Sequence, residues 1–264
     1  MPRLARDVEI GWQYRAAGFQ GYVLKAHYES TVGRAAAVAD ITGLAVVGGL
    51  ALNQHVGGIN PAAVRAALGA GARVVWMPTA DSHTQRAAGL PRLCCSDPRP
   101  GEHTYAVPPV ERKAEEAALL VLSLLAEADA VLATGHVSAA EVRWLLTHAS
   151  RAGVRRLLMT HPGYTVPSLP ARDARDLAVA SGALVEITCF QLLHQPGCTA
   201  ETLAAYIRTV GIERCVLSSD AGQPNSPPPP EALELLVDEL ARQGLDKGAL
   251  MSAASERPAS LVLS

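Results

Sequence analysis

The 264-residue sequence contains few aromatic side chains: they make up 4% of the residues, and only two of them are Phe. Because hydrophobic residues still make up 49%, the core is expected to consist mainly of Ala, Val and Leu. Charged residues make up 18%, which is low for a disordered chain and indicates a compact globular protein. At roughly 150 residues per domain, this length suits two small domains or one α/β barrel.

Long hydrophobic runs and an excess of one charge are also absent. The longest apolar runs, residues 43–52 and 117–126, are shorter than the roughly 18 residues that a membrane span needs. The formal net charge is -2, and Lys and Arg form no block that would bind a nucleic-acid backbone or an anionic membrane. The N-terminus has no apolar stretch followed by a cleavage site. We therefore expect a cytoplasmic protein that binds a small-molecule substrate, without nucleic-acid or membrane partners; a homo-oligomer is left open.

Several short motifs are missing. The five cysteines, at positions 94, 95, 189, 198 and 215, show no C-x-x-C spacing, so neither a disulfide framework nor a thiolate zinc site is supported. No G-x-G-x-x-G turn follows a predicted strand, and the Walker signature is absent. A dinucleotide-binding fold and a P-loop NTPase are therefore disfavoured.

Short apolar segments alternate with helical periodicity along the chain. The continuous hydrophobicity of these segments is typical of parallel strands that are buried on both faces. Seven such strands are predicted to begin at Tyr22, Leu44, Arg73, Ala130, Arg156, Leu184 and Cys215. Because a helix precedes the first of them, we predict a (β/α)8 TIM-like barrel that is missing or incomplete at strand 1. An open doubly wound sheet is the alternative.

The prediction is a single domain over residues 1–264. Residues 80–109 show little periodicity and are rich in Pro and Arg, which indicates a lid or insertion without regular structure. Asn60 before Pro61 predicts a helix start, and Ser138 with Glu141 forms a predicted capping box. The last predicted helix spans residues 247–254. With strand 1 missing, a gap is expected between the strands that begin at Tyr22 and Cys215.

Polar side chains follow four of the predicted strands. His27, His136 and His161 come directly after strands or after one intervening glycine, and Asp220 follows the last strand. Because the C-terminal ends of barrel strands converge on one mouth, we expect these side chains to meet. Two imidazoles and a carboxylate suit a divalent cation such as Zn²⁺, Mn²⁺, Co²⁺ or Fe²⁺ and leave positions open for water. Asp220 is then placed to accept the proton of a metal-activated water.

Three of these segments, Thr134-Gly135-His136, Thr160-His161-Pro162 and Ser218-Ser219-Asp220, resemble the amidohydrolase superfamily of metal-dependent (β/α)8 hydrolases. The resemblance covers nearly the whole chain. It implies hydrolysis of an amide, ester or lactone-like bond, with zinc as the first choice of metal. It also implies that His136, His161 and Asp220 are metal ligands from strands five, six and eight, and that His161 and Asp220 act in catalysis.

The sequence departs from this family in two places. Its members carry an H-x-H on strand one, and no H-x-H occurs here. The bridging Lys or Glu of strand four also has no match, so a two-metal centre is not expected. His27 is the candidate that would partly replace the missing metal ligands. The alternatives are a metal-dependent decarboxylase of the same superfamily and a degenerate, non-catalytic barrel.

Lys25, His55 and Gln223 are the candidates for substrate binding. Lys25 lies in an apolar strand, where a charge requires a partner, either a substrate anion or a carboxylate such as Glu186. A buried Lys–Glu pair without chemistry is an equal alternative. His55 follows the next strand, and Gln223 begins a proline-rich stretch after Asp220.

Overall fold

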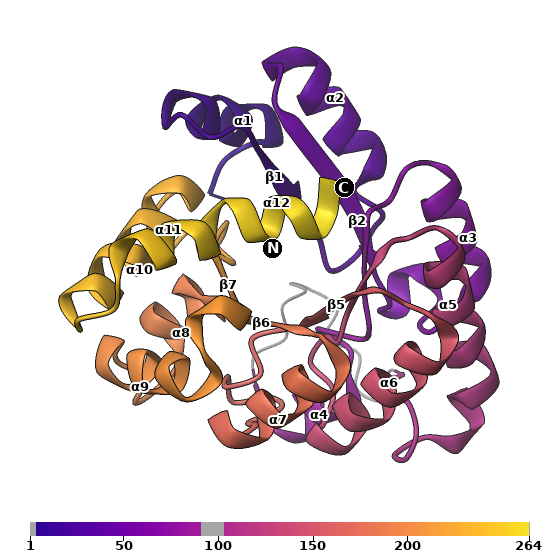
Figure 1. Ribbon diagram of the computed structural model, residues 1–264. Coiled ribbons are helices and arrows are strands. Elements are labelled where there is room, and N and C mark those ends of the chain that lie inside the picture. Colours follow the sequence, from indigo (N-terminus) through magenta and orange to yellow (C-terminus); the bar gives the residue numbers. More distant parts are fainter. Residues whose placement is uncertain (1–3, 91–102, 264) are drawn as a thin grey trace.

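The computed structural model describes residues 4–90 and 103–263. Its centre is a sheet of seven parallel strands, each paired with the next along the chain and curled like an incomplete barrel (Figure 1). The strands are β1 (Gly21–Leu24), β2 (Ala45–Ala51), β3 (Val74–Trp76), β4 (Val131–Ala133), β5 (Arg156–Met159), β6 (Leu184–Thr188) and β7 (Cys215–Ser218). All seven predicted strands are therefore confirmed. The sequential order excludes the doubly wound alternative, whose strand order reverses at a switch point.

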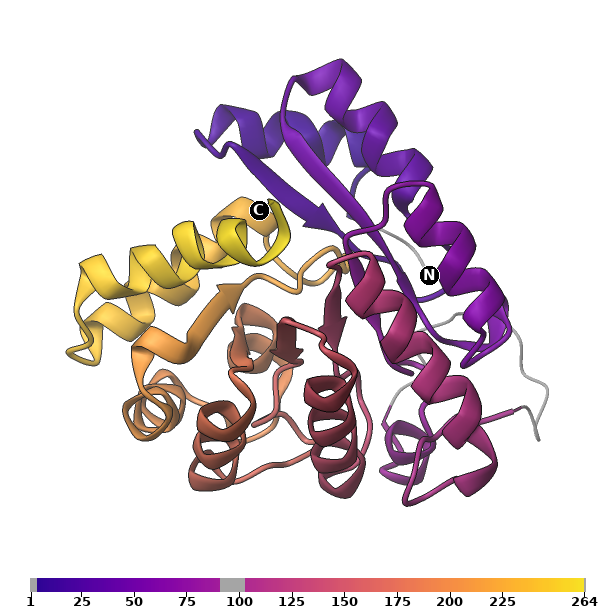
Figure 2. The ribbon, with the colours of Figure 1, turned by 45° about the vertical axis from the view of Figure 1, so that its right-hand side comes forward.

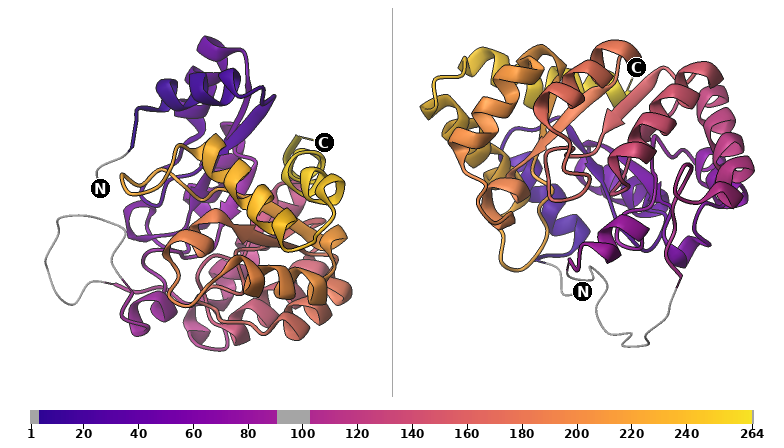
Figure 3. Two further views of the ribbon diagram at one scale, coloured as in Figure 1. Left: turned by 90° about the vertical axis from the view of Figure 1, so that its left-hand side faces the viewer. Right: turned by 90° about the horizontal axis from the view of Figure 1, so that it is seen from below.

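Helices between the strands cover the outer side of the curved sheet (Figures 2 and 3). In chain order they are α1 (Asp7–Ala16), α2 (Val32–Thr42), α3 (Pro61–Gly69), α4 (His83–Ala87), α5 (Glu115–Glu127), α6 (Ala139–Ala152), α7 (Ala171–Ser181), α8 (Cys189–His194), α9 (Ala200–Val210), α10 (Pro229–Arg242), α11 (Lys247–Ala254) and α12 (Glu256–Leu263). The Asn60 side chain caps α3 and the Ser138–Glu141 capping box starts α6, both as predicted. Within the described residues, no helix has the length and apolar character needed to span a membrane.

The strands divide the core into two layers. Residues such as Val75, Leu132 and Ile187 belong to the large cluster that the strands form with the covering helices. The alternating residues, among them Trp76 and Val131, form a smaller cluster of their own. Successive side chains of a strand point to opposite faces of the sheet, so burial on both faces explains the continuous apolar runs in the sequence.

The C-terminal helix α12 closes one end of this smaller cluster. Leu261 and Val262 of α12 pack into it, next to side chains from β2, β3, β4, β5 and β7. Arg73 donates a hydrogen bond to the carbonyl of Val262, and Arg156 donates to the carbonyls of Ser260 and Leu261. Because Arg73 and Arg156 lie at the N-terminal ends of β3 and β5, α12 covers the end of the sheet opposite to the mouth.

The sheet is open between its first and last strands. In the described part of the chain, the strand pairings run from β1 to β7 without a ladder between those two, and we call this unpaired junction the seam. Near it, the backbone N–H of Leu4 donates to the carbonyl of Gly222 at 3.0 Å. A gap between these strands was predicted, and the absence of a ladder agrees with it.

Three short helices were not predicted. Helix α4 lies inside the region expected to lack regular structure, and it begins where the Ser82 hydroxyl accepts from the Gln85 N–H. Helix α8 has a capping box between Thr188 and Gln191, a signal present in the sequence. Helix α12 contains Pro258, which its first turn tolerates because the N–H groups there have no partner within the helix. Residues 91–102 of the expected insertion lie outside the described residues.

Candidate metal and catalytic site

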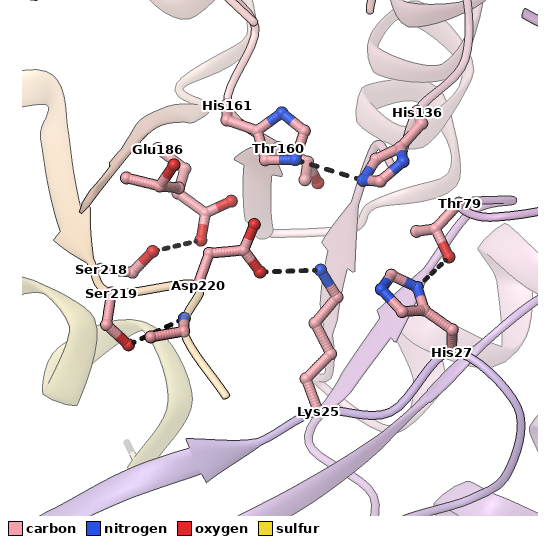
Figure 4. A network of polar contacts seen from close by, with 12 residues as sticks. Lys25, His27, Thr79, His136, Thr160, His161, Glu186, Ser218, Ser219 and Asp220 are labelled. Atoms are coloured by element: carbon pink, nitrogen blue, oxygen red, sulfur yellow. Dashed lines mark hydrogen bonds and ion pairs between the residues drawn. The ribbon is translucent and has the colours of Figure 1, made fainter. Parts of the chain in front are cut away.

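The two histidines that follow β4 and β5 face each other at the mouth (Figure 4). The Nε2 atoms of His136 and His161 lie 3.2 Å apart, and both side chains are buried. Two reciprocal hydrogen bonds fix the strand ends that carry them: the Gly135 N–H donates to Thr160 Oγ1, and the Thr160 N–H donates to Thr134 Oγ1, both at 3.0 Å. The backbone of paired strands thus determines the spacing of the two imidazoles.

Unusual backbone conformations occur at this place. His161 has φ of 23° and Asp220 has φ of 46°, values that residues with a side chain rarely adopt. Gly135 has φ of 70°, and a Cβ there would lie 2.3 Å from the carbonyl oxygen of Met77. Such strain persists only where surrounding structure enforces it, and it is concentrated at functional sites.

The imidazole pair fits two ligands of one metal ion. Two nitrogens that each lie ~2.0–2.1 Å from a tetrahedral cation are separated by roughly 3.3 Å, close to the spacing found here. Burial lowers the pKa of His161 to about 4 and holds the pKa of His136 well below its usual value. Both rings are therefore neutral near pH 7, which is the form that binds metals.

Two further observations bear on this fit. Among the described residues, no three His, Cys, Asp or Glu side chains are grouped closely enough to enclose a cation. The Nδ1 atoms of His136 and His161 are buried without a hydrogen-bond partner there, although metal-bound histidines commonly donate from the second nitrogen. The arrangement thus supplies two of the predicted ligands, and the carboxylate that was predicted as the third makes a different contact.

That carboxylate, Asp220, interacts with Lys25 across the seam. Lys25 Nζ lies 3.5 Å from Asp220 Oδ1, and the side chains are 19% and 23% exposed (Figure 4). Burial alone would raise the pKa of Asp220, but Lys25, with His161 and His27, lowers it below its usual value. Asp220 is therefore ionised at neutral pH. Lys25 was predicted to lie inside the first strand, but β1 ends at Leu24 and Lys25 follows it directly.

Glu186, the partner expected for Lys25, is hydrogen-bonded elsewhere. It lies on β6, and Ser218 on β7 donates to its Oε1 at 2.8 Å. Burial, followed by the charge of Asp220, raises the pKa of Glu186. Lys25 makes its ion pair with Asp220 because that carboxylate projects from the neighbouring strand end across the seam. The expected Lys25–Glu186 pair is thus replaced by Lys25–Asp220.

His27 lies on the other side of Lys25. Its Nδ1 is 2.8 Å from the hydroxyl oxygen of Thr79, a residue that follows β3. The Asn53 amide donates to Thr79 Oγ1 at 2.7 Å and to the His27 carbonyl at 2.8 Å. Burial, followed by the charge of Lys25, lowers the pKa of His27 to about 3. The ring is therefore neutral and held through Nδ1.

The two remaining candidates lie at the margin of the site. His55 is exposed in a short 3-10 turn, Gln54–Val56, and its ring contacts Tyr28 with centroids 4.9 Å apart. Both ends of the Gln223 side chain are engaged: Nε2 donates to the Asp220 carbonyl, and Oε1 accepts from Ser226. Gln223 therefore braces the loop that carries Asp220.

Three residues of the site were missed in the sequence. Asn53 and Thr79 are fully buried behind His27, and each follows a strand within two or three residues, the same signal that identified the histidines. Tyr164 contacts the His161 ring with centroids 5.1 Å apart. Burial and the nearby charge of Asp220 raise the pKa of its hydroxyl. Nothing in the local sequence distinguishes Tyr164, because its position depends on the turn after His161.

Comparison with solved structures shows the same fold in several hydrolases. An amidohydrolase from Pseudomonas aeruginosa superposes with a TM-score of 0.66 at 9% identity, covering 97% of this chain and 92% of that one. A lactonase from Listeria monocytogenes gives 0.64 at 13% identity, covering 98% and 86%. A TatD homologue from Escherichia coli gives 0.60 at 17%, covering 98% and 92%. At these identities the likeness concerns the fold alone.

Sequence comparison is less informative about chemistry. None of the curated proteins matches the sequence. Residues 1–186 match the model of a family of unknown function, DUF6282. Because this match covers well over half of the chain, the protein belongs to the DUF6282 family.

Proposed function

We propose that this protein is a metal-dependent hydrolase of an amide, ester or lactone bond in a small molecule. The observation that carries the proposal is the pair of buried, neutral imidazoles of His136 and His161 with their Nε2 atoms 3.2 Å apart. The fold is shared with an amidohydrolase, an organophosphorus hydrolase and a lactonase, which supports hydrolysis as the reaction class.

His136 and His161 would hold the cation, and Asp220 would complete the ligand set. Zinc is the first choice because imidazole and carboxylate suit it, and Mn²⁺, Co²⁺ and Fe²⁺ suit the same donors. When bound, such a cation lowers the pKa of a water molecule and polarises a carbonyl group.

The chain's own residues supply the proton transfers. Hydrolysis forms a bond between a water oxygen and the carbonyl carbon, and the proton released from the water passes to the Asp220 carboxylate. The bond to the leaving oxygen or nitrogen then breaks, and Asp220 returns the proton to that atom. Lys25 keeps Asp220 ionised before the reaction, and the half-buried Glu186 with Ser218 fixes the neighbouring strand ends.

The metal content of the purified protein tests this proposal. We expect about one Zn²⁺ per chain after reconstitution, with binding lost in His136→Asn and His161→Asn. His148→Asn is the matched control, because His148 stacks on Trp144 in α6 outside the mouth. The reconstituted protein should hydrolyse one of a set of dihydrocoumarin, phenyl acetate and acetanilide.

Two results would contradict the proposal. Metal binding equal in the wild type and in His136→Asn would remove the ligand assignment. Turnover of none of the three probes with any of the four metals, or release of carbon dioxide from a carboxylic acid without uptake of water, would remove hydrolysis as the reaction.

A further inference from the structure

The hydrogen bonds behind His27 determine which of its nitrogens carries the proton. Asn53 Oδ1 accepts from the N–H groups of Thr79 at 2.9 Å and Asp81 at 3.1 Å, so the amide oxygen must face these two donors. The opposite orientation would bring the NH2 group against two N–H groups. The amide nitrogen therefore donates to Thr79 Oγ1.

Thr79 Oγ1 thus accepts one hydrogen bond and has its own proton to donate. In the described residues, the remaining contact of this hydroxyl is with His27 Nδ1 at 2.8 Å. Thr79 is fully buried, so a hydroxyl proton without an acceptor would lose its hydration without compensation. The arrangement that satisfies every group has Thr79 donating to His27 Nδ1, and a neutral imidazole then carries its proton on Nε2.

The Nε2 atom of His27 is directed toward the middle of the site. Figure 4 shows this nitrogen turned away from Thr79, toward the space between Lys25 and His136. The charged and titratable groups that interact with the His27 ring through their charge are Lys25, Asp220 and His161. A protonated Nε2 is a hydrogen-bond donor and has no lone pair for a metal, and it stands beside the ammonium group of Lys25, which is also a donor.

We infer that His27 is a catalytic hydrogen-bond donor, which binds the carbonyl oxygen of the substrate through Nε2–H and, together with Lys25, stabilises the negative charge that develops there. This role rests on the proposed hydrolysis, and it replaces our expectation that His27 binds metal. Thr79 and Asn53 are positioning residues that fix the tautomer. A donor directed at a developing oxyanion in a water-poor site contributes strongly to acyl transfer.

The tautomer is measured by ¹⁵N NMR of the histidine ring nitrogens, first without metal and then with Zn²⁺. We expect His27 to show a protonated Nε2 and an unprotonated Nδ1 in both states. Benzoate is the binding probe, because its carboxylate oxygen stands in for the oxyanion. Its addition should shift the His27 Nε2–H resonance in a saturable manner, whether or not the protein hydrolyses any substrate.

Kinetic variants test the catalytic part. With dihydrocoumarin, His27→Leu should lower kcat by about 10²–10³-fold and leave the Zn²⁺ affinity unchanged. His27→Gln, which keeps an N–H at similar reach, should recover most of the loss. Thr79→Val removes the hydroxyl that donates to Nδ1, so His27 should no longer be held in the form with its proton on Nε2. Thr79→Ser keeps a hydroxyl and should retain that form. His148→Gln is the matched control and should leave both kcat and the Zn²⁺ affinity unchanged.

An unprotonated Nε2, or loss of its proton when Zn²⁺ is added, would overturn the inference, as would a His27 resonance that does not respond to benzoate. A fall in Zn²⁺ affinity of more than about 100-fold in His27→Leu, beyond what loss of a neighbouring group causes, would make His27 a metal ligand instead. Failure of the proposed function appears differently, as absent Zn²⁺ binding and absent turnover with the benzoate response intact.

Discussion

His136 and His161 extend from paired strands, whereas Lys25 and Asp220 meet across the unpaired seam. In the first region, reciprocal hydrogen bonds between Thr134, Gly135 and Thr160 set the distance between the imidazoles. In the second, a 3.5 Å ion pair links the two strand ends at the mouth. Geometry is thus fixed by the backbone on one side and by charge on the other, so the two sides should respond differently to substitution and to pH.

The largest expected effect is on the seam side. Asp220→Asn keeps the shape of the side chain but removes the base, so kcat of the zinc-loaded protein for dihydrocoumarin should fall by about 10²–10⁴-fold. The fold should remain intact by circular dichroism. Asp238→Asn is the matched control, since Asp238 is 52% exposed and pairs with Lys247 on the surface. Full activity in Asp220→Asn would exclude Asp220 as the general base.

The pH dependence of stability should separate the two regions. The folded-state pKa is lowered to about 3 for His27 and to about 4 for His161, and it is also lowered for His136. Below about 6.5 the unfolded chain binds protons at these histidines and the metal-free native state does not, so native stability falls as the pH falls. Each histidine contributes up to about 1.4 kcal/mol per pH unit in that window.

Asp220 affects native stability at lower pH than the histidines do. Its folded-state pKa is lowered, so its stabilising contribution is present above the unfolded value of about 3.9 and is lost as the pH falls through the folded value. Urea unfolding of metal-free protein between pH 7 and pH 4 therefore reports mainly on the three histidines, because Glu186, whose folded-state pKa is raised, acts in the opposite direction and offsets at most one of them. Constant stability over this range would show that the three rings are protonated or solvated in the native state.

A glycine comparison tests how tightly the paired side is built. Gly135→Ala places a Cβ 2.3 Å from the Met77 carbonyl oxygen at a φ of 70°. Gly153→Ala, at a φ of 83°, meets nothing within 4 Å and measures the backbone strain alone. We expect Gly153→Ala to lower the free energy of unfolding by about 1 kcal/mol, and Gly135→Ala by about 1–3 kcal/mol more. Equal losses in urea unfolding would mean that the turn at Gly135 adjusts freely.

The seven strands could be predicted from the sequence because burial on both faces leaves continuous apolar runs between helices. The same reasoning brought His136 and His161 together, since the C-terminal ends of parallel strands meet at one mouth. It also expected Asp220 to join them as a third ligand, but that carboxylate pairs with Lys25, and the described residues hold no group of three ligands. It failed for α12, whose packing against the far end of the sheet depends on Arg73 and Arg156, residues more than a hundred positions away in the chain.

The pairings inside the site were harder to predict than its members. Lys25 was expected to face a substrate anion or a carboxylate, with Glu186 as the candidate, but Ser218 donates to Glu186 and Asp220 approaches Lys25 across the seam. The orientation of His27 depends on Thr79 and Asn53, which follow two other strands. Such choices among several buried partners are decided by three-dimensional geometry, and single-sequence patterns do not encode them.

The last comparison uses Lys25→Met and is read from the position of the pH–rate profile, where the expected change is smaller than the losses of rate above. Lys25 lowers the pKa of Asp220, so its removal should raise that pKa and move the acid limb of the pH–rate profile to higher pH. Lys247→Met, which breaks the exposed pair with Asp238, should leave the limb in place. Thr160→Val should also leave it in place, because it removes a hydrogen bond of the paired side, while lowering stability by about 1–3 kcal/mol. An acid limb that moves in Thr160→Val and stays in Lys25→Met would show that the backbone, and not the charge across the seam, sets the ionisation of Asp220.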